Sequence, residues 1–131
     1  MLLRSTFPLL MVVAALAGCK DDDLTPAQQL QHRWTWQRST GGIGGWTHTP
    51  SSTGQQQAIE FDRRGTVRFY TNGQLTRTDS YVLQTGSSIR SSQPVELIVY
   101  GNGGRQSYQL SGTQLTLFDE VYDGYTAEYQ R

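Results

Sequence analysis

The amino-acid sequence predicts an all-β domain, an antiparallel up-and-down β-barrel of about eight strands formed by residues 31–131. Short runs of alternating apolar and polar residues, typical of strands that bury one face, fill most of this range. Turn pairs such as Asn72-Gly73 and Asp123-Gly124 separate the runs and supply the positive φ angles of tight hairpins. No part of the range shows a helical repeat of useful length.

The strands follow one another in chain order. In the first, Trp34 and Trp36 share a face. In each later strand a set of residues likewise shares one face. These sets are Ile59 with Phe61, Val67 with Phe69, Tyr81 with Leu83, Leu97 with Val99, Tyr108 with Leu110, Leu115 with Leu117, and Tyr125 with Ala127 and Tyr129. Short links favour a barrel over a sandwich, which usually needs longer crossings, and closure removes exposed strand edges. The one long link, residues 39–55, is expected to be an irregular loop.

Residues 1–18 have the zones of a bacterial signal peptide. Arg4 supplies the positive charge, and Phe7–Leu16 is apolar but shorter than the ~20 residues of a membrane span. The segment Leu16-Ala17-Gly18-Cys19 then resembles the lipobox of bacterial lipoproteins. That resemblance implies diacylation of the Cys19 sulfur and cleavage before Cys19. Two or more acyl chains would hold the protein stably at a membrane.

Residues 19–30 are expected to form a flexible, lipidated tether. The alternative is that Thr25 caps a short helical turn, with Pro26 at its first position, which plugs one end of the barrel. Lys20-Asp21-Asp22-Asp23 is similar to a signal that sends lipoproteins to the cell surface, and an ordinary acidic linker is the alternative. We therefore expect an outer-membrane lipoprotein of the cell envelope, on the periplasmic face or the cell surface.

Four motifs follow one another over residues 30–131: the opening Trp34-Thr35-Trp36, the hairpin Ile59-Glu60-Phe61-Asp62 before Gly65, the run Tyr108–Leu117 and the ending Tyr129-Gln130-Arg131. Their order resembles that of the small bacterial lipocalin-like lipoproteins of the calycin type. The resemblance implies that Trp34 packs at the closed end of the barrel under Arg131. His32 stands where the classical pattern has glycine.

Composition narrows the function further. Without Arg4, the mature chain has 10 basic and 11 acidic residues (11 − 1 against 11), a net charge of −1 with no basic field for nucleic acid. A single cysteine permits no internal disulfide. His32 and His48 lack partners at metal-ligand spacing, and Gly41–Gly45 lacks the lysine of a phosphate loop.

The acidic group Asp119, Glu120 and Asp123 lacks the ligand order of a calcium loop and indicates a solvated turn. No motif indicates a catalytic nucleophile or an acid–base pair. We therefore expect neither an enzyme nor a bound cofactor or metal.

The leading hypothesis is a membrane-anchored binding module for a small hydrophobic ligand. Tyr81, Tyr108 and Arg68 are the candidate residues that orient the ligand between apolar walls. Trp46 is expected to act with Ile43 as a lid over the barrel mouth, hinged on mobile glycines. The main alternative is a structural or interaction protein with a fully packed barrel, and a weaker one is an enzyme. The structural alternative requires outward-facing aromatic and aliphatic residues, for which Tyr70, Ile98 and Tyr100 are the candidates.

Overall fold

The computed structural model of the chain describes residues 23–131, so the signal peptide, Cys19 and residues 20–22 lie outside the described residues. The strands are β1 (Arg33–Gly41), β2 (Trp46–His48), β3 (Gln57–Phe61), β4 (Thr66–Thr71), β5 (Gln74–Gly86), β6 (Val95–Tyr100), β7 (Arg105–Ser111), β8 (Gln114–Asp119) and β9 (Tyr125–Gln130), and the helices are α1 (Pro26–Leu30) and α2 (Pro50–Thr53). Among residues 23–131, neither helix has the length and apolar character needed to cross a membrane.

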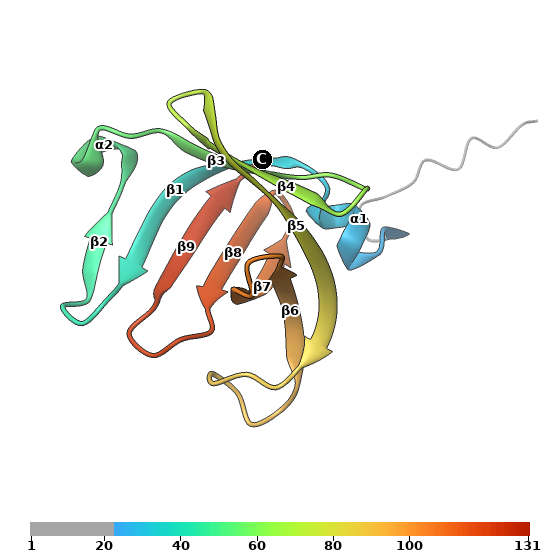
Figure 1. Cartoon of the computed structure of the whole chain (residues 1–131). Coiled ribbons are helices and arrows are strands. Elements are labelled where there is room, and N and C mark those ends of the chain that lie inside the picture. The colour runs from blue at the N-terminus through green and yellow to red at the C-terminus, as the bar shows by residue number, and fades with distance from the viewer. Residues whose placement is uncertain (1–22) are drawn as a thin grey trace, which may run out of the picture.

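The strands form one antiparallel sheet in the order β2-β1-β3-β4-β5-β6-β7-β8-β9 (Figure 1). Pairing of β1 with β9 closes β1 and β3 to β9 into an eight-stranded up-and-down barrel, and β2 is an extra strand beside β1. The predicted fold class is therefore confirmed. We call the end of the barrel that α1 covers the closed end, and the opposite end, with the β6–β7 and β8–β9 turns, the mouth.

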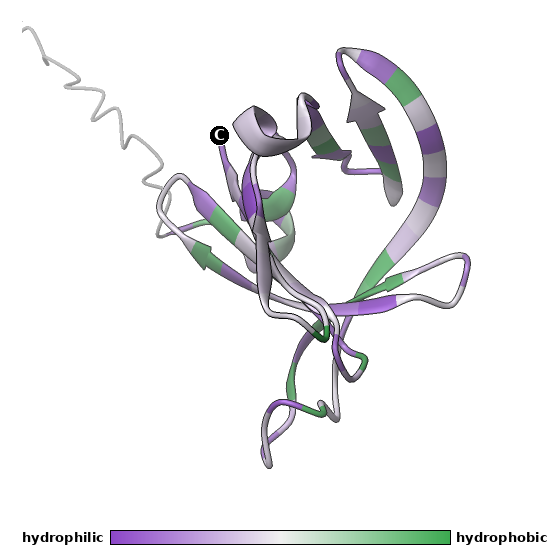
Figure 2. Cartoon of the chain, turned by 90° about the vertical axis from the view of Figure 1, so that its left-hand side faces the viewer, coloured by the Kyte–Doolittle hydropathy of each residue, from purple (hydrophilic) through white to green (hydrophobic). Residues whose placement is uncertain are grey.

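The alternation in the sequence appears directly in the strands. On β1, Trp34 and Trp36 are buried while Arg33, Thr35 and Gln37 are exposed. Hydrophobic and hydrophilic residues alternate in the same way along other strands (Figure 2). At the predicted turn between β4 and β5, both Asn72 and Gly73 have positive φ angles, 51° and 78°, as a two-residue hairpin requires.

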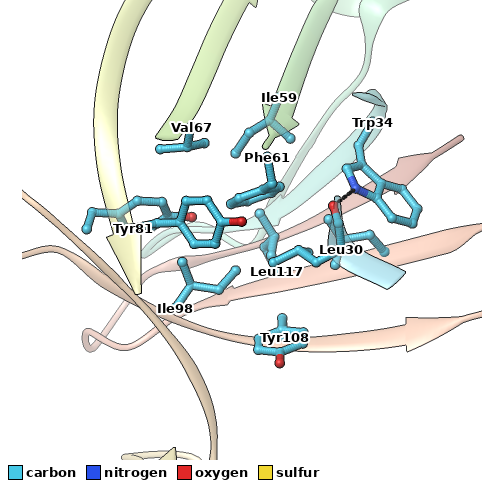
Figure 3. Close-up of a cluster of buried hydrophobic side chains, with 11 residues drawn as sticks. Leu30, Trp34, Ile59, Phe61, Val67, Tyr81, Ile98, Tyr108 and Leu117 are labelled. Atoms are coloured by element: carbon cyan, nitrogen blue, oxygen red, sulfur yellow. Dashed lines mark hydrogen bonds between the residues drawn. The ribbon is translucent and has the colours of Figure 1, made fainter. Parts of the chain in front are cut away.

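The closed end of the barrel is sealed by α1 and a buried tryptophan. The side chain of Thr25 and that of Gln28 form a reciprocal capping box, and Pro26 occupies the first turn. Leu30 is completely buried in the core, and the indole Nε1 of Trp34 donates to the Leu30 carbonyl oxygen at 2.9 Å (Figure 3). Residues 26–30 therefore form the helical turn and not a flexible tether.

The C-terminal residue covers the same tryptophan. The guanidinium carbon of Arg131 lies 5.9 Å from the centroid of the Trp34 ring, and Arg131 Nη1 lies 2.7 Å from His32 Nε2. The His32 ring in turn meets the Trp34 ring edge-on, with 5.9 Å between centroids. The pairing of Trp34 with Arg131 that the family resemblance implies is thus present, and His32 joins it.

The expected faces of β6 are wrong. Ile98 and Tyr100, predicted on the outer face, point inward and belong to the main core cluster. Leu97 is also fully buried, beside the buried Ser107 of β7, yet it lies outside that cluster. The reason is that the apolar run from Leu97 to Tyr100 has no alternation from which to choose a face. Of the aromatic candidates for an outer surface, Tyr70 alone remains outside the core, under the guanidinium of Arg33 at 4.1 Å.

Residues 39–55 do not form the irregular loop expected from the sequence. β1 runs on to Gly41 and turns into β2, with Thr40 paired to Thr47. Thr49 then caps α2, with Pro50 in its first turn and a reciprocal bond from Ser52. Short local motifs therefore order a segment whose composition indicates flexibility.

Candidate functional site

The barrel mouth holds a pocket of about 310 Å³, lined by inward side chains from five consecutive strands. These are Phe69 on β4, Arg77 on β5, Tyr100 on β6, Gln106 on β7 and Asp119 on β8. Strand register places them together, because Phe69 is the partner of Arg77 and Gln106 is the partner of Asp119. Val121, in the β8–β9 turn, lines the rim. We call this site the mouth pocket.

Aromatic rings and one cation form the apolar side of the mouth pocket. The rings of Phe69 and Tyr100 pack against each other at a tilt of 53°, with 6.2 Å between centroids. The guanidinium of Arg77 lies over the Phe69 ring at 4.2 Å and within 3.7 Å of Asp79. The Arg77 side chain is half exposed, so its charge is accessible from the mouth.

A chain of hydrogen bonds forms the polar side. Tyr100 Oη donates to Gln106 Oε1 at 2.6 Å, and Gln106 Nε2 donates to Asp119 Oδ1 at 2.8 Å. The backbone N–H of Tyr125 donates to the other Asp119 oxygen at 2.9 Å. The chain ties β6, β7, β8 and β9 together and leaves hydrogen-bonding groups at the wall of the pocket.

Two tyrosines of this region stay protonated at neutral pH. Burial, followed by nearby Tyr129, raises the pKa of Tyr100 well above its usual value. Burial, followed by the Asp119 carboxylate, raises the pKa of Tyr129 to about 12. Both hydroxyls are therefore neutral, and that of Tyr100 already donates its proton in the bond to Gln106.

A second, smaller pocket of about 240 Å³ lies beside the mouth, below β2 and α2. Trp36, Ser39, His48, Thr53, Gln57 and Tyr125 line it. Trp36 Nε1 donates to Ser39 Oγ at 2.8 Å, and the His48 and Tyr125 rings are 6.0 Å apart. Tyr125 connects the two pockets, since its backbone binds Asp119 of the mouth pocket.

The three ligand-orienting residues predicted from the sequence lie elsewhere. Tyr81 is a core residue, and its hydroxyl donates to the carbonyl oxygen of Asp62 at 2.5 Å. Tyr108 packs its ring against the core while its hydroxyl points away (Figure 3). Arg68 binds Asp62 at 3.1 Å and approaches Glu60 at 3.8 Å. The structure therefore does not bring these three together at the mouth pocket.

The predicted lid residues stand at the mouth without covering it. Trp46 pairs with Gly41 and is 63% exposed, and Ile43 is 91% exposed. The indole lies over Gly44 of its own turn, where an added methyl group would come within 2.5 Å of Trp46 Cε2. Trp46 lines neither of the two pockets at the mouth.

Sequence reasoning missed Arg77, Gln106 and Asp119. A two-residue hairpin at Asn72-Gly73 predicts the strand register across β4 and β5, but a bulge after Phe69 shifts it by one residue. The bulge places Arg77 opposite Phe69, and no sequence signal marks it.

Comparison with known proteins finds no match to a family model, a curated protein or a solved structure.

Proposed function

We propose that this chain is a lipid-anchored, lipocalin-like protein of the cell envelope that binds a small amphipathic ligand at its barrel mouth. The mouth pocket is the observation that carries the proposal. An eight-stranded barrel can be filled by side chains or hold one small ligand. Here side chains fill the closed end, and a pocket with aromatic, charged and hydrogen-bonding groups remains at the mouth.

The lining of the mouth pocket suggests the chemistry of the ligand. Phe69 and Val121 offer apolar surface, whereas Arg77 and Arg105 offer two guanidinium groups. The one lining carboxylate, Asp119, already accepts hydrogen bonds from Gln106 and from the backbone of Tyr125, so the positive charge predominates. A ligand with an apolar body and an acidic head group would use both sides. This refines the purely apolar ligand expected from the sequence, because pockets fix orientation through a few polar groups among apolar walls.

The lipid anchor rests on Leu16-Ala17-Gly18-Cys19 and on the polar segment that follows it. The described chain enters the barrel at the closed end, through α1 (Figure 1). A tether from Cys19 would therefore attach at the end opposite the mouth. An outer-membrane location and display at the cell surface belong to the same proposal.

Changing Cys19→Ala should abolish membrane association. Two acyl chains give stable anchoring, and without the thiol no chain can be attached. In a detergent phase-partition assay of cells expressing the full chain, the wild type should enter the detergent phase and the variant the aqueous phase. Equal partition of the two proteins would refute the anchor.

Changing Arg77→Gln should weaken binding of the fluorescent probe 1-anilinonaphthalene-8-sulfonate about five-fold. The probe has an apolar body and a sulfonate, and a partly exposed ion pair contributes up to ~1 kcal/mol. Fluorescence titration of the mature domain measures the change. Arg64→Gln is the matched control, since Arg64 is an exposed residue of the β3–β4 turn at the closed end. Equal weakening in both variants would exclude the mouth pocket as the site.

A second candidate function is interaction through the rim of the mouth. The large, exposed apolar residues at this rim are Ile43 in the β1–β2 turn, Trp46 at the start of β2, and Val121 and Tyr122 in the β8–β9 turn. The two turns neighbour each other through the pairing of Gly41 with Tyr125. Such a patch favours a protein that acts through its surface. An absence of probe binding by the wild type would favour this alternative.

A further inference from the structure

A pocket of about 420 Å³ lies on the side of the barrel. It sits between the β5–β6 loop, residues 87–94, and the strands β6, β7 and β8. Arg90, Ser91, Glu96, Tyr108, Gln109 and Phe118 are among its lining residues. It shares no lining residue with the mouth pocket, and we call it the side pocket.

The loop that forms one wall of the side pocket is held in place. The Glu120 carboxylate accepts hydrogen bonds from Ser88 Oγ at 2.8 Å and from the Ile89 N–H at 3.0 Å. The guanidinium of Arg90 lies over the Phe118 ring at 4.1 Å. The Glu120 contacts hold Ser88 and Ile89 against the β8–β9 turn, and Arg90 packs on β8, so this wall of the pocket is held by side-chain contacts.

The barrel wall opens beside this pocket. Between β6 and β7 the described pairing stops at Leu97 with Ser107. Beyond that point each strand is still paired on its other side. Val95 of β6 pairs with Gly86 of β5, and Ser111 of β7 pairs with Gln114 of β8. Tyr108 lies directly after the last pair, at the edge of this opening.

The Tyr108 hydroxyl is the unexplained group at the site. Tyr108 is 9% exposed, its ring belongs to the core, and its hydroxyl points away from the other labelled core side chains (Figure 3). Among the described residues this enclosed oxygen has no hydrogen-bond partner. Burial, followed by the Glu96 carboxylate, raises the pKa of Tyr108 to about 12, so the group stays a neutral donor. Leaving a buried hydroxyl unsatisfied costs free energy that a bound ligand would recover.

The remaining lining selects the ligand class. Arg90 and Glu96 contribute opposite charges. A cationic ligand would therefore be repelled by Arg90, and an anionic ligand by Glu96. Ser91, Gln109 and Tyr108 add uncharged groups that both donate and accept hydrogen bonds. A neutral polyhydroxylated molecule matches this set, because each of its hydroxyls also does both.

We infer that the side pocket binds a neutral saccharide unit, with one sugar hydroxyl bonded to the Tyr108 hydroxyl. Arg90 and Glu96 are exposed at the outer side of the pocket, and the Arg90 side chain would leave the Phe118 ring as the sugar reaches the enclosed oxygen. The sugar's C–H groups would pack on Val95 at the pocket wall. This site is independent of the ligand proposed for the mouth.

The test is a titration of the mature chain, carrying Cys19→Ala so that it remains in solution, with glucose, galactose and N-acetylglucosamine. Isothermal titration calorimetry and amide chemical shifts of Ser107 and Gln109 report binding. At least one sugar should bind, and Tyr108→Phe should weaken that binding about two- to ten-fold. Tyr70→Phe, which removes a hydroxyl from a tyrosine outside the core on β4, should leave the affinity unchanged.

Stability separates a binding role from a merely structural one. Without sugar, Tyr108→Phe should be as stable as the wild type or more so, because the hydroxyl makes no described hydrogen bond. Three results would each overturn the inference. The first is an unchanged sugar affinity in Tyr108→Phe, and the second is no binding of any of the three sugars. The third is selective binding of the zwitterion glycine at the same amides. Loss of probe binding at the mouth would leave it intact, since the two sites share no residue.

Discussion

Replacing Trp34 with alanine should lower the free energy of unfolding by about 3–5 kcal/mol, the usual cost of truncating a fully buried large aromatic residue. Trp34 has no exposed surface and sits where α1 closes the barrel. Its loss would leave a cavity, free the Leu30 carbonyl oxygen from its 2.9 Å hydrogen bond, and remove the ring beneath Arg131. Chemical denaturation followed by fluorescence of the remaining tryptophans would measure the change.

The control for this substitution is Trp46→Ala in the same chain. Trp46 is 63% exposed, so its removal should change stability by no more than about 0.5 kcal/mol. Both substitutions remove the same side chain, and they differ in burial. If Trp34→Ala proved no more costly than Trp46→Ala, the closed end would not be the centre of the core.

Replacing Gly41 with alanine should cost about 2–4 kcal/mol, a large effect for one methyl group. Gly41 has φ +146°, a conformation that residues with a side chain rarely adopt. Its added Cβ would also overlap the backbone carbonyl oxygen of Gly124, which cannot move aside as a side chain can. Because Gly41 pairs with Tyr125, the change would loosen the closure of β1 with β9 at the mouth and weaken probe binding as well.

Gly45→Ala is the matched control in the same hairpin. Gly45 also has a positive φ, +65°, but a methyl group added there would have no atom within 4 Å. Its substitution should cost only the conformational strain, about 1–2 kcal/mol. Thermal unfolding of both variants compares them, and an equal loss at the two positions would show that β1 and β9 do not approach closely at Gly41.

The barrel itself could be predicted because its signals are local. Period-two alternation in β1, β3 and β4 shows which side chains turn inward, and Asn72-Gly73 specifies a hairpin on its own. The capping residues of α1 are visible in the sequence too, although composition favours a tether. What decides for the helix is the burial of Leu30, a tertiary effect that local pattern does not contain.

The mouth pocket could not be predicted because its residues meet only after the barrel closes. Arg77 faces Phe69 through a bulge, and Asp119 ends β8, although its acidic neighbours in the sequence indicate a solvated turn. Tyr100 lies in an apolar run without alternation, so the sequence predicts the wrong face for it. Tyr108 is a candidate from the sequence, but an opening between β6 and β7 turns its hydroxyl toward the side of the barrel.

The location of ligand binding is tested most directly by chemical-shift mapping. Isotope-labelled mature chain, carrying Cys19→Ala, would be titrated with 1-anilinonaphthalene-8-sulfonate while its backbone amides are followed by NMR. The largest shifts should fall on Tyr100, Gln106, Asp119 and Tyr125, which the hydrogen-bond chain joins at the mouth. Shifts centred on the closed end or on the side pocket, with these four amides unmoved, would contradict ligand binding at the barrel mouth.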